Sequence, residues 1–349
     1  MRFKYTLTWI FLFFLSMQLI FFSVLKKEKI DSILKREKIT LSHLGHLENK
    51  NVYQQLDAYV SDHFPFKNQF IAQSNWLFKG VFREANANNQ VLWGENDWLF
   101  YNATINDENG MNEAFGYKAL TIRELKKIIR NIHTIKNWCN RNHIYFELMI
   151  CPNKHSIYPE NLPGSYQNQQ QKSQLNQLVS YDPSIVNLIK TLRKSKKTNT
   201  ELYYRWDTHW NQYGAYLAVK ELTHRLQNKY PFIKSFDAKI NQVTTHREMD
   251  LANMIGLNGY FQTTDVHLSF TKVPTQRIPK LMIVHDSFLH SMMPSLEKIF
   301  HNITSKPYST DGLLSPEILL REHVDVYIIE LVERYKGVLL GDIHPDFYK

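Results

Sequence analysis

Residues 281–288 read LMIVHDSF, in which the apolar run 281–284 is followed by His285, Asp286 and Ser287. Consecutive apolar residues of this kind are typical of a short strand buried on both faces, as in a parallel sheet. The residues that follow, as far as Phe300, predict a helix. In parallel sheets, reactive groups gather just past the carboxyl ends of the strands. The stretch therefore predicts an α/β fold and marks Ser287 as a candidate nucleophile.

Asp286 and Ser287 also have a simpler interpretation, because Asp and Ser are among the commonest helix N-caps. A hydroxyl at a helix N-terminus nevertheless lies near free backbone N–H groups, which stabilise an oxyanion. Ser291 lies one turn further along the predicted helix and is the weaker candidate. His285 and His290 flank Ser287 as rival bases, but neither has an evident carboxylate to orient it.

The remaining apolar patterns extend this strand–helix unit into a sheet. Residues 91–101 (VLWGENDWLFY) alternate and break at the polar GEND segment, which predicts a hairpin. Strands alternating with helices predict a mostly parallel sheet with helices on both faces. The other predicted strands are 144–151, 200–204 and 324–331, and the other predicted helices are 119–142, 174–193 (interrupted near 182–183) and 211–227.

A second candidate cluster is the segment WDTHW, which contains Asp207 and His209. A serine hydroxyl is a poor nucleophile until a base takes its proton, and a carboxylate commonly orients a histidine base. On a turning segment, Asp207 can hold one imidazole nitrogen while the other faces Ser287. The flanking Trp206 and Trp210 are candidates to exclude water or to stack on sugar rings. The alternative is that Asp207 is a helix cap and His209 a surface residue.

Composition describes an ordinary globular protein of 349 residues, with 43% hydrophobic and 21% charged residues. The formal net charge of +9 suits an anionic polymer, but no nucleic-acid-binding module is recognisable, so we expect no nucleic-acid partner. No nucleotide-binding loop or zinc motif occurs, and we expect neither a cofactor nor a metal. Cys139 and Cys151 are compatible with a disulfide or with two buried thiols.

The N-terminus predicts a membrane anchor. Residues 9–25 are apolar and uncharged, and Arg2 and Lys4 precede them, which favours a cytoplasmic N-terminus. No small-residue cleavage pattern follows the run, so we expect an uncleaved signal-anchor over residues 1–25. Residues 26–55 predict a stalk, with helical spacing at Ile30, Ile33 and Leu34. Residues 56–349 would then form one domain outside the cytoplasm.

An ordered set of motifs over most of the chain resembles the SGNH-hydrolase-like family of alginate O-acetyltransferases, the AlgJ/AlgX type. The motifs are DHFPFK (62–67), GENDWLFY (94–101), PNKHSIYPENLP (152–163), DTHWNQYGAYLA (207–218), DLANMIGL (250–257), HDSF (285–288) and VDVYIIELVER (324–334). The resemblance implies an SGNH-hydrolase-like (flavodoxin-like) sheet flanked by helices.

The resemblance also implies residue roles. The family's Asp-x-His pair falls on Asp207 and His209, and its nucleophile falls on Ser287. Lys154 and Asp250 would lie near the cleft, so they join Trp206 and Trp210 as candidate substrate-binding residues. One departure is His285, where the family usually has a glycine that permits a tight turn.

The function implied is a periplasmic polysaccharide O-acetyltransferase of the inner membrane. Ser287 would take an acetyl group, and a sugar hydroxyl of a polysaccharide, expected to be acidic, would then receive it. The family typically depends on a multi-span membrane acyltransferase to supply acetyl groups. Two alternatives stay open: an acetylesterase with the same triad, and a non-catalytic glycan-binding scaffold of an export complex.

Overall fold

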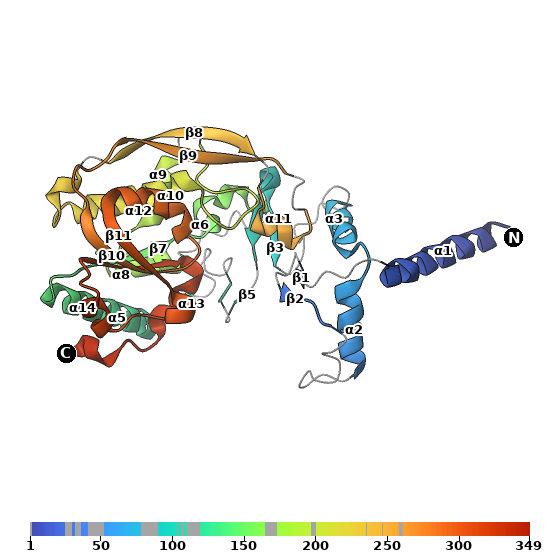
Figure 1. Cartoon of the computed structure of the whole chain (residues 1–349), viewed down its shortest axis with the longest axis horizontal. Helices are drawn as coiled ribbons and strands as arrows, with labels where there is room; N and C mark the ends of the chain where they lie inside the picture. Colours follow the sequence, from blue (N-terminus) through green and yellow to red (C-terminus); the bar gives the residue numbers. More distant parts are fainter. Residues whose placement is uncertain are drawn as a thin grey trace.

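The computed structural model describes residues 2–24, 30–31, 36–40, 52–77, 90–102, 104–105, 108–109, 119–164, 173–196, 200–234, 236–245, 247–257 and 261–349. Figure 1 shows a layered α/β body that ends in the C-terminus, with the N-terminal helices extending away from it.

The body is built on a four-stranded parallel sheet of order β11-β10-β12-β7. The strands are β7 (Tyr145–Cys151), β10 (Ile278–His285), β11 (Phe300–Pro307) and β12 (Val326–Val332). The mostly parallel sheet and the strands predicted at 144–151, 281–285 and 324–331 are confirmed. The sequence did not predict β11, because this edge strand is half polar (FHNITSKP) and lacks the apolar run of strands buried on both faces.

Helices cover both faces of the sheet, as predicted: α9, α10 and α12 lie on one side, and α5 and α14 on the other (Figure 1). Thr121 and Glu124 form a reciprocal capping box at the start of α5, which satisfies two backbone N–H groups. The bounds are α5 (Ile122–Arg141), α8 (Gln174–Tyr181), α9 (Leu188–Ser195), α10 (Gln212–Leu226), α12 (Leu289–Ile299) and α14 (Pro316–Arg321).

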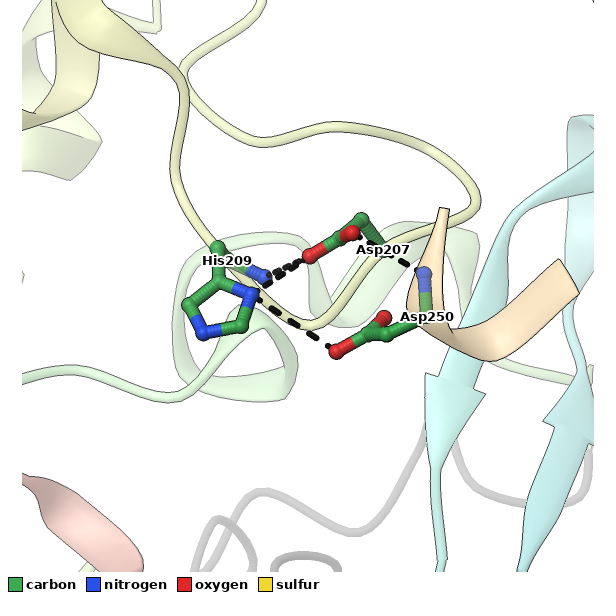
Figure 2. A group of neighbouring side chains, drawn as sticks. All are labelled: Asp207, His209 and Asp250. Atoms are coloured by element: carbon green, nitrogen blue, oxygen red, sulfur yellow. Dashed lines mark hydrogen bonds and ion pairs between the residues drawn. The ribbon is translucent and has the colours of Figure 1, made fainter. Parts of the chain in front are cut away.

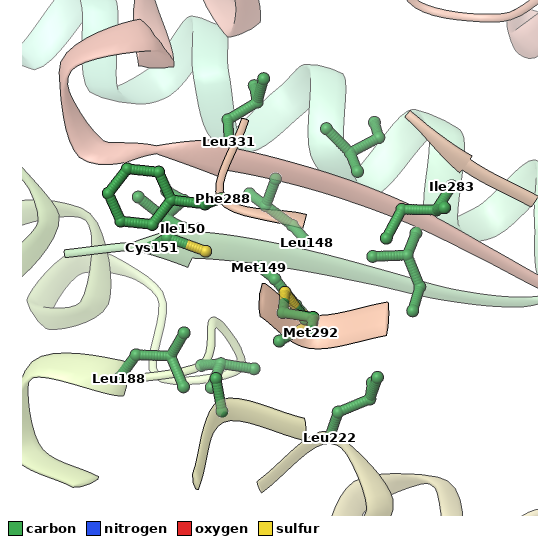
Figure 3. Close-up of a cluster of buried hydrophobic side chains, with 14 of the residues drawn as sticks. Leu148, Met149, Ile150, Cys151, Leu188, Leu222, Ile283, Phe288, Met292 and Leu331 are labelled. Carbon is green, nitrogen blue, oxygen red and sulfur yellow. The ribbon is translucent and has the colours of Figure 1, made fainter. Parts of the chain in front are cut away.

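The main core lies between the sheet and these helices (Figure 3). In Figure 3 Met149 and Cys151 of β7 lie on the side of Leu188 of α9, Leu222 of α10 and Met292 of α12, whereas Leu148 and Ile150 point to the opposite face of the sheet. Burial of these apolar surfaces is the largest favourable contribution to folding.

The two cysteines are buried and free, so the predicted alternative of a disulfide is wrong. Cys139 lies on α5 and Cys151 ends β7. The Cys151 thiol instead donates a hydrogen bond to Glu330 on the neighbouring strand β12.

Two antiparallel hairpins flank the sheet. The hairpin predicted at 91–101 is confirmed as β3 (Val91–Trp93) and β4 (Leu99–Tyr101). A longer ribbon, β8 (Asp237–Thr245) with β9 (Thr263–Lys272), was not predicted and crosses above α10 (Figure 1). Val266, Leu268 and Phe270 alternate with polar residues in β9 and pack on the main core, so this period-2 pattern was the available signal for the ribbon.

The short elements connect these parts. They are β1 (Ile30–Asp31), β2 (Arg36–Glu37), η3 (Glu95–Asp97), β5 (Thr104–Ile105), β6 (Glu108–Asn109), α6 (Lys154–Ile157), η4 (Pro159–Asn161), η5 (Pro231–Ile233), α11 (Asp250–Met254), α13 (Tyr308–Asp311), η6 (Glu333–Leu340) and η7 (Pro345–Tyr348).

The N-terminal part contains α1 (Arg2–Val24), α2 (Val52–His63) and α3 (Lys67–Leu77). The apolar run is helical as far as Val24. Among the described residues, however, no helix combines the length and the hydropathy needed to cross a membrane. Ile30 lies in a strand and not in the predicted helical spacing. Ile33, Leu34 and most of the predicted stalk lie outside the described residues.

The core predicts a stability effect at Ile283, a fully buried residue of β10. Ile283→Ala removes apolar contacts and leaves a cavity, and we expect it to lower the free energy of unfolding by about 2–5 kcal/mol. Urea denaturation followed by circular dichroism measures the change. Lys239→Ala, at an exposed position of β8, is the control, and an effect of equal size there would contradict the assignment of the core.

Candidate active site

The Asp-x-His segment lies on a loop that folds back on itself. Tyr203 and Trp210 form an isolated antiparallel bridge, so the strand predicted at 200–204 reduces to this single pairing. The Asn211 N–H donates to the carbonyl of Leu202, and the Asn211 side chain caps α10 by accepting from two backbone N–H groups. The loop thus has a defined shape before any ligand binds.

This shape lets Asp207 and His209 face each other although they stand two residues apart. Asp207 Oδ1 lies 2.6 Å from His209 Nδ1 and also accepts the His209 backbone N–H at 2.9 Å. Figure 2 shows the carboxylate beside the imidazole. Because an ionised carboxylate accepts only, Nδ1 carries the proton and Nε2 is left as an acceptor.

Ser287 lies at the end of β10, exposed between two buried residues, Asp286 and Phe288. The carboxylate of Asp286 accepts the Phe288 N–H at 2.8 Å and the Val332 N–H at 2.6 Å. The turn is therefore attached to the end of the neighbouring strand β12. Helix α12 begins at Leu289 with no side-chain cap, so neither Asp286 nor Ser287 is its N-cap.

The two segments meet at the predicted contact. His209 Nε2 lies 2.7 Å from Ser287 Oγ, a hydrogen bond between residues 78 positions apart. The contact is supported from behind by Trp210, whose indole N–H donates to the carbonyl of Phe288 at 3.0 Å. Ser287, His209 and Asp207 thus form a continuous hydrogen-bonded triad.

Asp250, predicted near the cleft, is the first residue of α11 and lies beside Asp207 and His209 (Figure 2). Its carboxylate accepts the backbone N–H of Thr208 at 2.7 Å and also the Thr208 hydroxyl. One oxygen lies 3.6 Å from His209 Nδ1, and the Asp250 N–H donates to Asp207 at 3.0 Å. Asp250 therefore braces the pair from the side.

Lys154 is buried under the loop and cannot bind substrate directly, contrary to its prediction as a substrate-binding residue. Only 2% of it is exposed, and its ammonium donates to the carbonyls of Tyr204, Arg205 and Asp207 at 3.1, 3.0 and 2.7 Å. Burial lowers the pKa of Lys154 to about 7, against the attraction of the nearby carboxylates. Lys154 holds the loop in place.

The prediction that Trp210 stacks on a sugar is also wrong. Trp210 is fully buried, and its indole N–H already donates a hydrogen bond to the Phe288 carbonyl. Trp206 is half-buried and stacks on Phe261, with ring centroids 4.6 Å apart and planes 12° from parallel.

Several neighbouring groups were assigned no role from sequence. Thr208 links Asp250 to the loop, and Glu330 on β12 lies 3.3 Å from the Asp286 N–H. Arg334 lies with its guanidinium carbon 5.7 Å from the centre of the Phe288 ring and binds Asn153. A carboxyl within an otherwise apolar buried strand was the available signal for Glu330, because such groups are rarely buried without a partner.

His285, the departure from the family pattern, is accommodated without strain. Its backbone φ is not positive, so no glycine is required at this position. Its Nδ1 lies 2.7 Å from the Asp286 carbonyl oxygen and donates to it.

The local electrostatics shift the pKa values of Asp207 and His209 in opposite directions. Burial opposes ionisation of Asp207, but the hydrogen bond and charge of His209 keep its pKa well below the usual range. Burial also disfavours the charged form of His209 and so lowers its pKa, but the hydrogen bond and charge of Asp207, together with the charge of Asp250, outweigh this and raise the pKa. Burial and the charge of Asp207 raise the pKa of Asp250. The environment favours an ionised Asp207 beside a more basic His209.

Asp207, His209 and Asp250 are also close enough to offer three ligand atoms to one metal ion, all within 4.8 Å of one another. However, each carboxylate oxygen of Asp207 and Asp250 already accepts a hydrogen bond from the protein. A cation would have to displace these donors, so the contacts favour a hydrogen-bonded group over a metal site.

Comparison with protein families identifies this arrangement. Residues 91–283 match the family model of the SGNH hydrolase-like domain of the acetyltransferase AlgX. The chain belongs to this family. The matched region contains Asp207 and His209 and ends before Ser287, so for the serine the hydrogen bond to His209 is the evidence.

Individual relatives of the family are distant. The probable alginate O-acetylase AlgJ of Pseudomonas fluorescens is 23% identical over 191 residues, which are 50% of this chain and 43% of that protein. The match thus spans less than half of this curated relative.

Solved structures resemble the chain weakly. The O-acetyltransferase domain of Pseudomonas putida AlgJ gives a TM-score of 0.49 at 17% identity, covering 74% of this chain and 95% of that one. Bacillus cereus PatB1 with a sulfonyl adduct gives 0.49 at 11% identity, covering 75% and 97%.

The two carboxylates beside His209 predict a pH effect. Because both raise the pKa of His209, we expect it to titrate above the usual 6.5 and to be neutral only above that higher value. Asp250→Asn removes one negative charge and should shift the midpoint to lower pH. NMR titration of the ¹⁵N-histidine-labelled chain, with the signal assigned through His209→Gln, measures both values. An unchanged midpoint in Asp250→Asn would show that this carboxylate has no influence on the imidazole.

The buried ammonium predicts a positioning effect. Lys154→Met removes the ammonium donor from three loop carbonyls; that of Arg205 keeps the Leu99 N–H, and each of the others, once unsatisfied, costs about 1–3 kcal/mol. We expect the loop to shift and the reaction rate of Ser287 with an organophosphonate probe to fall by about 100-fold. Lys196→Met, which removes a lysine bound to Ile157 and Glu160 away from the loop, is the matched control. Equal rates in the two variants would refute the positioning role.

Proposed function

We propose that the chain is a polysaccharide O-acetyltransferase that carries the acetyl group on Ser287. The observation that supports this most is the position of His209, with Nε2 2.7 Å from the Ser287 hydroxyl and Nδ1 2.6 Å from Asp207. Family membership supplies the reaction class, and the contact supplies the residues that would perform it.

In the first half-reaction, Ser287 Oγ attacks the carbonyl carbon of the acetyl donor while its proton passes to His209 Nε2. The resulting imidazolium is stabilised by Asp207. The tetrahedral oxyanion needs hydrogen-bond donors. The backbone N–H of Ser287 is suited to this, since no partner for it occurs in the described part of the chain. Collapse expels the leaving group, which takes the proton from His209, and acetyl-Ser287 remains.

In the second half-reaction, a sugar hydroxyl attacks the acetyl-serine carbonyl and gives its proton to His209 Nε2. The second tetrahedral intermediate collapses, Ser287 regains the proton, and the acetylated sugar departs. The same imidazole thus acts as base and acid in both halves, which requires its pKa to lie near the working pH.

We further propose that the acceptor is an acidic polysaccharide of the cell envelope. The net charge of +9 favours a polyanion, and the curated relative is described as a probable alginate O-acetylase. The acetyl donor would be a multi-span membrane acyltransferase. An anchor over residues 1–25 would hold the domain on the periplasmic side of the inner membrane, close to this donor.

Intact mass spectrometry tests the nucleophile. The full-length chain in detergent is incubated with p-nitrophenyl acetate, and we expect an acetyl adduct on Ser287 that is absent from Ser287→Ala. Ser291→Ala is the matched control, because Ser291 bonds only weakly to the Trp210 carbonyl at 3.4 Å and should retain the adduct. A folded wild type without an adduct would favour the non-catalytic scaffold.

A second step separates transfer from hydrolysis. The acetylated chain is mixed with alginate oligosaccharide or with buffer alone. Acetylated sugar as the main product supports the transferase, whereas equal release of free acetate with and without glycan supports the acetylesterase.

A further inference from the structure

A cavity of about 350 Å³ lies between the loop that carries the triad histidine and the β8–β9 ribbon. The loop contributes Glu201, Arg205 and Trp206 to its wall, and the ribbon contributes Gln242 and Thr264. Neither the serine nor the Asp-x-His pair lines it. The cavity is therefore separate from the reacting atoms, although one wall is built on the same loop.

The lining is more polar than that of most ligand pockets, because Trp206 and Val266 are its only apolar residues. Amide and hydroxyl groups dominate, and the single charged pair is internally neutralised. Arg205 Nε and Nη2 both bind one oxygen of Glu201, at 2.8 and 2.6 Å. This pairing disfavours a phosphate, which would need an uncompensated positive charge.

Such a lining suits a sugar ring. Sugar hydroxyls both donate and accept, so they match side-chain amides, a carboxylate and a guanidinium that remain partly exposed, here 38% for Glu201 and 42% for Arg205. The Trp206 indole, held by its stack on Phe261, adds an apolar wall. The volume lies at the lower end of ligand pockets, roughly 300–1,000 Å³, and favours a small unit over a long chain.

The cavity is also connected to the catalytic loop by hydrogen bonds. The Gln242 side chain donates to the Thr200 hydroxyl at 2.9 Å and ties the ribbon to the loop. The carbonyl of Arg205 accepts from both the Lys154 ammonium and the Leu99 N–H, at 3.0 and 2.9 Å. A ligand held by the Arg205 side chain would therefore be bound to the same loop that carries His209.

We propose that this cavity is an accessory glycan subsite, which binds a sugar unit of the acceptor polysaccharide other than the one that is acetylated. The inference rests on the proposed function for its choice of polysaccharide. Holding a second unit on the loop converts part of the encounter with the acceptor into a positioned, intramolecular step. The hydroxyl chemistry is shared by neutral and acidic glycans, so the test includes both.

Binding to the full-length chain in detergent tests the proposal, with oligomannuronate and cello-oligosaccharide as separate probes in isothermal titration calorimetry. Thr264→Trp fills the cavity from an exposed position of β9, and we expect it to weaken binding by about tenfold or more. Thr271→Trp places the same side chain at an exposed position of the same strand outside the cavity and should change Kd by less than about twofold. Arg205→Gln is a second variant and should also weaken binding.

The outcomes are distinct. Weakened binding of either probe in Thr264→Trp and Arg205→Gln, but not in Thr271→Trp, supports the subsite, and the probe that binds more tightly identifies the class of glycan. A wild type that forms acetyl-Ser287 but binds neither probe overturns the subsite alone. Binding that both cavity variants leave unchanged overturns it as well. Cavity-dependent binding by a chain that forms no adduct would retain the subsite and refute the transferase.

Discussion

The hydrogen bond from the Trp210 indole to the Phe288 carbonyl joins the two halves of the site. It is buried, and it connects the Asp-x-His loop to the turn after β10, two segments that share no local sequence relation. Both partners are large fully buried residues, so their packing and their polar contact reinforce each other. The exposed bond between His209 and Ser287 depends on this inner one, because a surface hydrogen bond alone contributes little to orientation.

Beneath the site, buried polar groups determine the shape of irregular backbone. The Lys154 ammonium satisfies three loop carbonyls, and the Asp286 carboxylate satisfies two N–H groups. Buried backbone groups must be paired. The loop carbonyls and the Phe288 N–H lie outside helices and strands, and Val332 is the last residue of β12, so side chains pair these groups. Side chains with several donors or acceptors take that role, so residues which resemble substrate ligands in the sequence are structural supports.

Some features of the fold could be predicted from the sequence alone. The runs at 144–151, 281–285 and 324–331 predicted strands because a strand covered on both faces must be apolar throughout. The edge strand β11 escaped prediction, since an exposed strand carries no such constraint, whereas the β8–β9 ribbon carried a readable signal in the alternation of Val266, Leu268 and Phe270. Lys154 and Trp210 were wrongly predicted to bind substrate, because the type of a residue indicates its chemistry but not whether it is buried.

The sequence by itself determined the α/β class, the family, and the identity of Asp207, His209 and Ser287 as candidates, because hydrophobic periodicity and short motifs are local properties of the chain. Only the tertiary structure decided that these three side chains touch, that Asp250 charges the same imidazole, and that a polar cavity adjoins the loop. These are relations between segments far apart in the chain, and packing together with buried hydrogen bonds sets their distances.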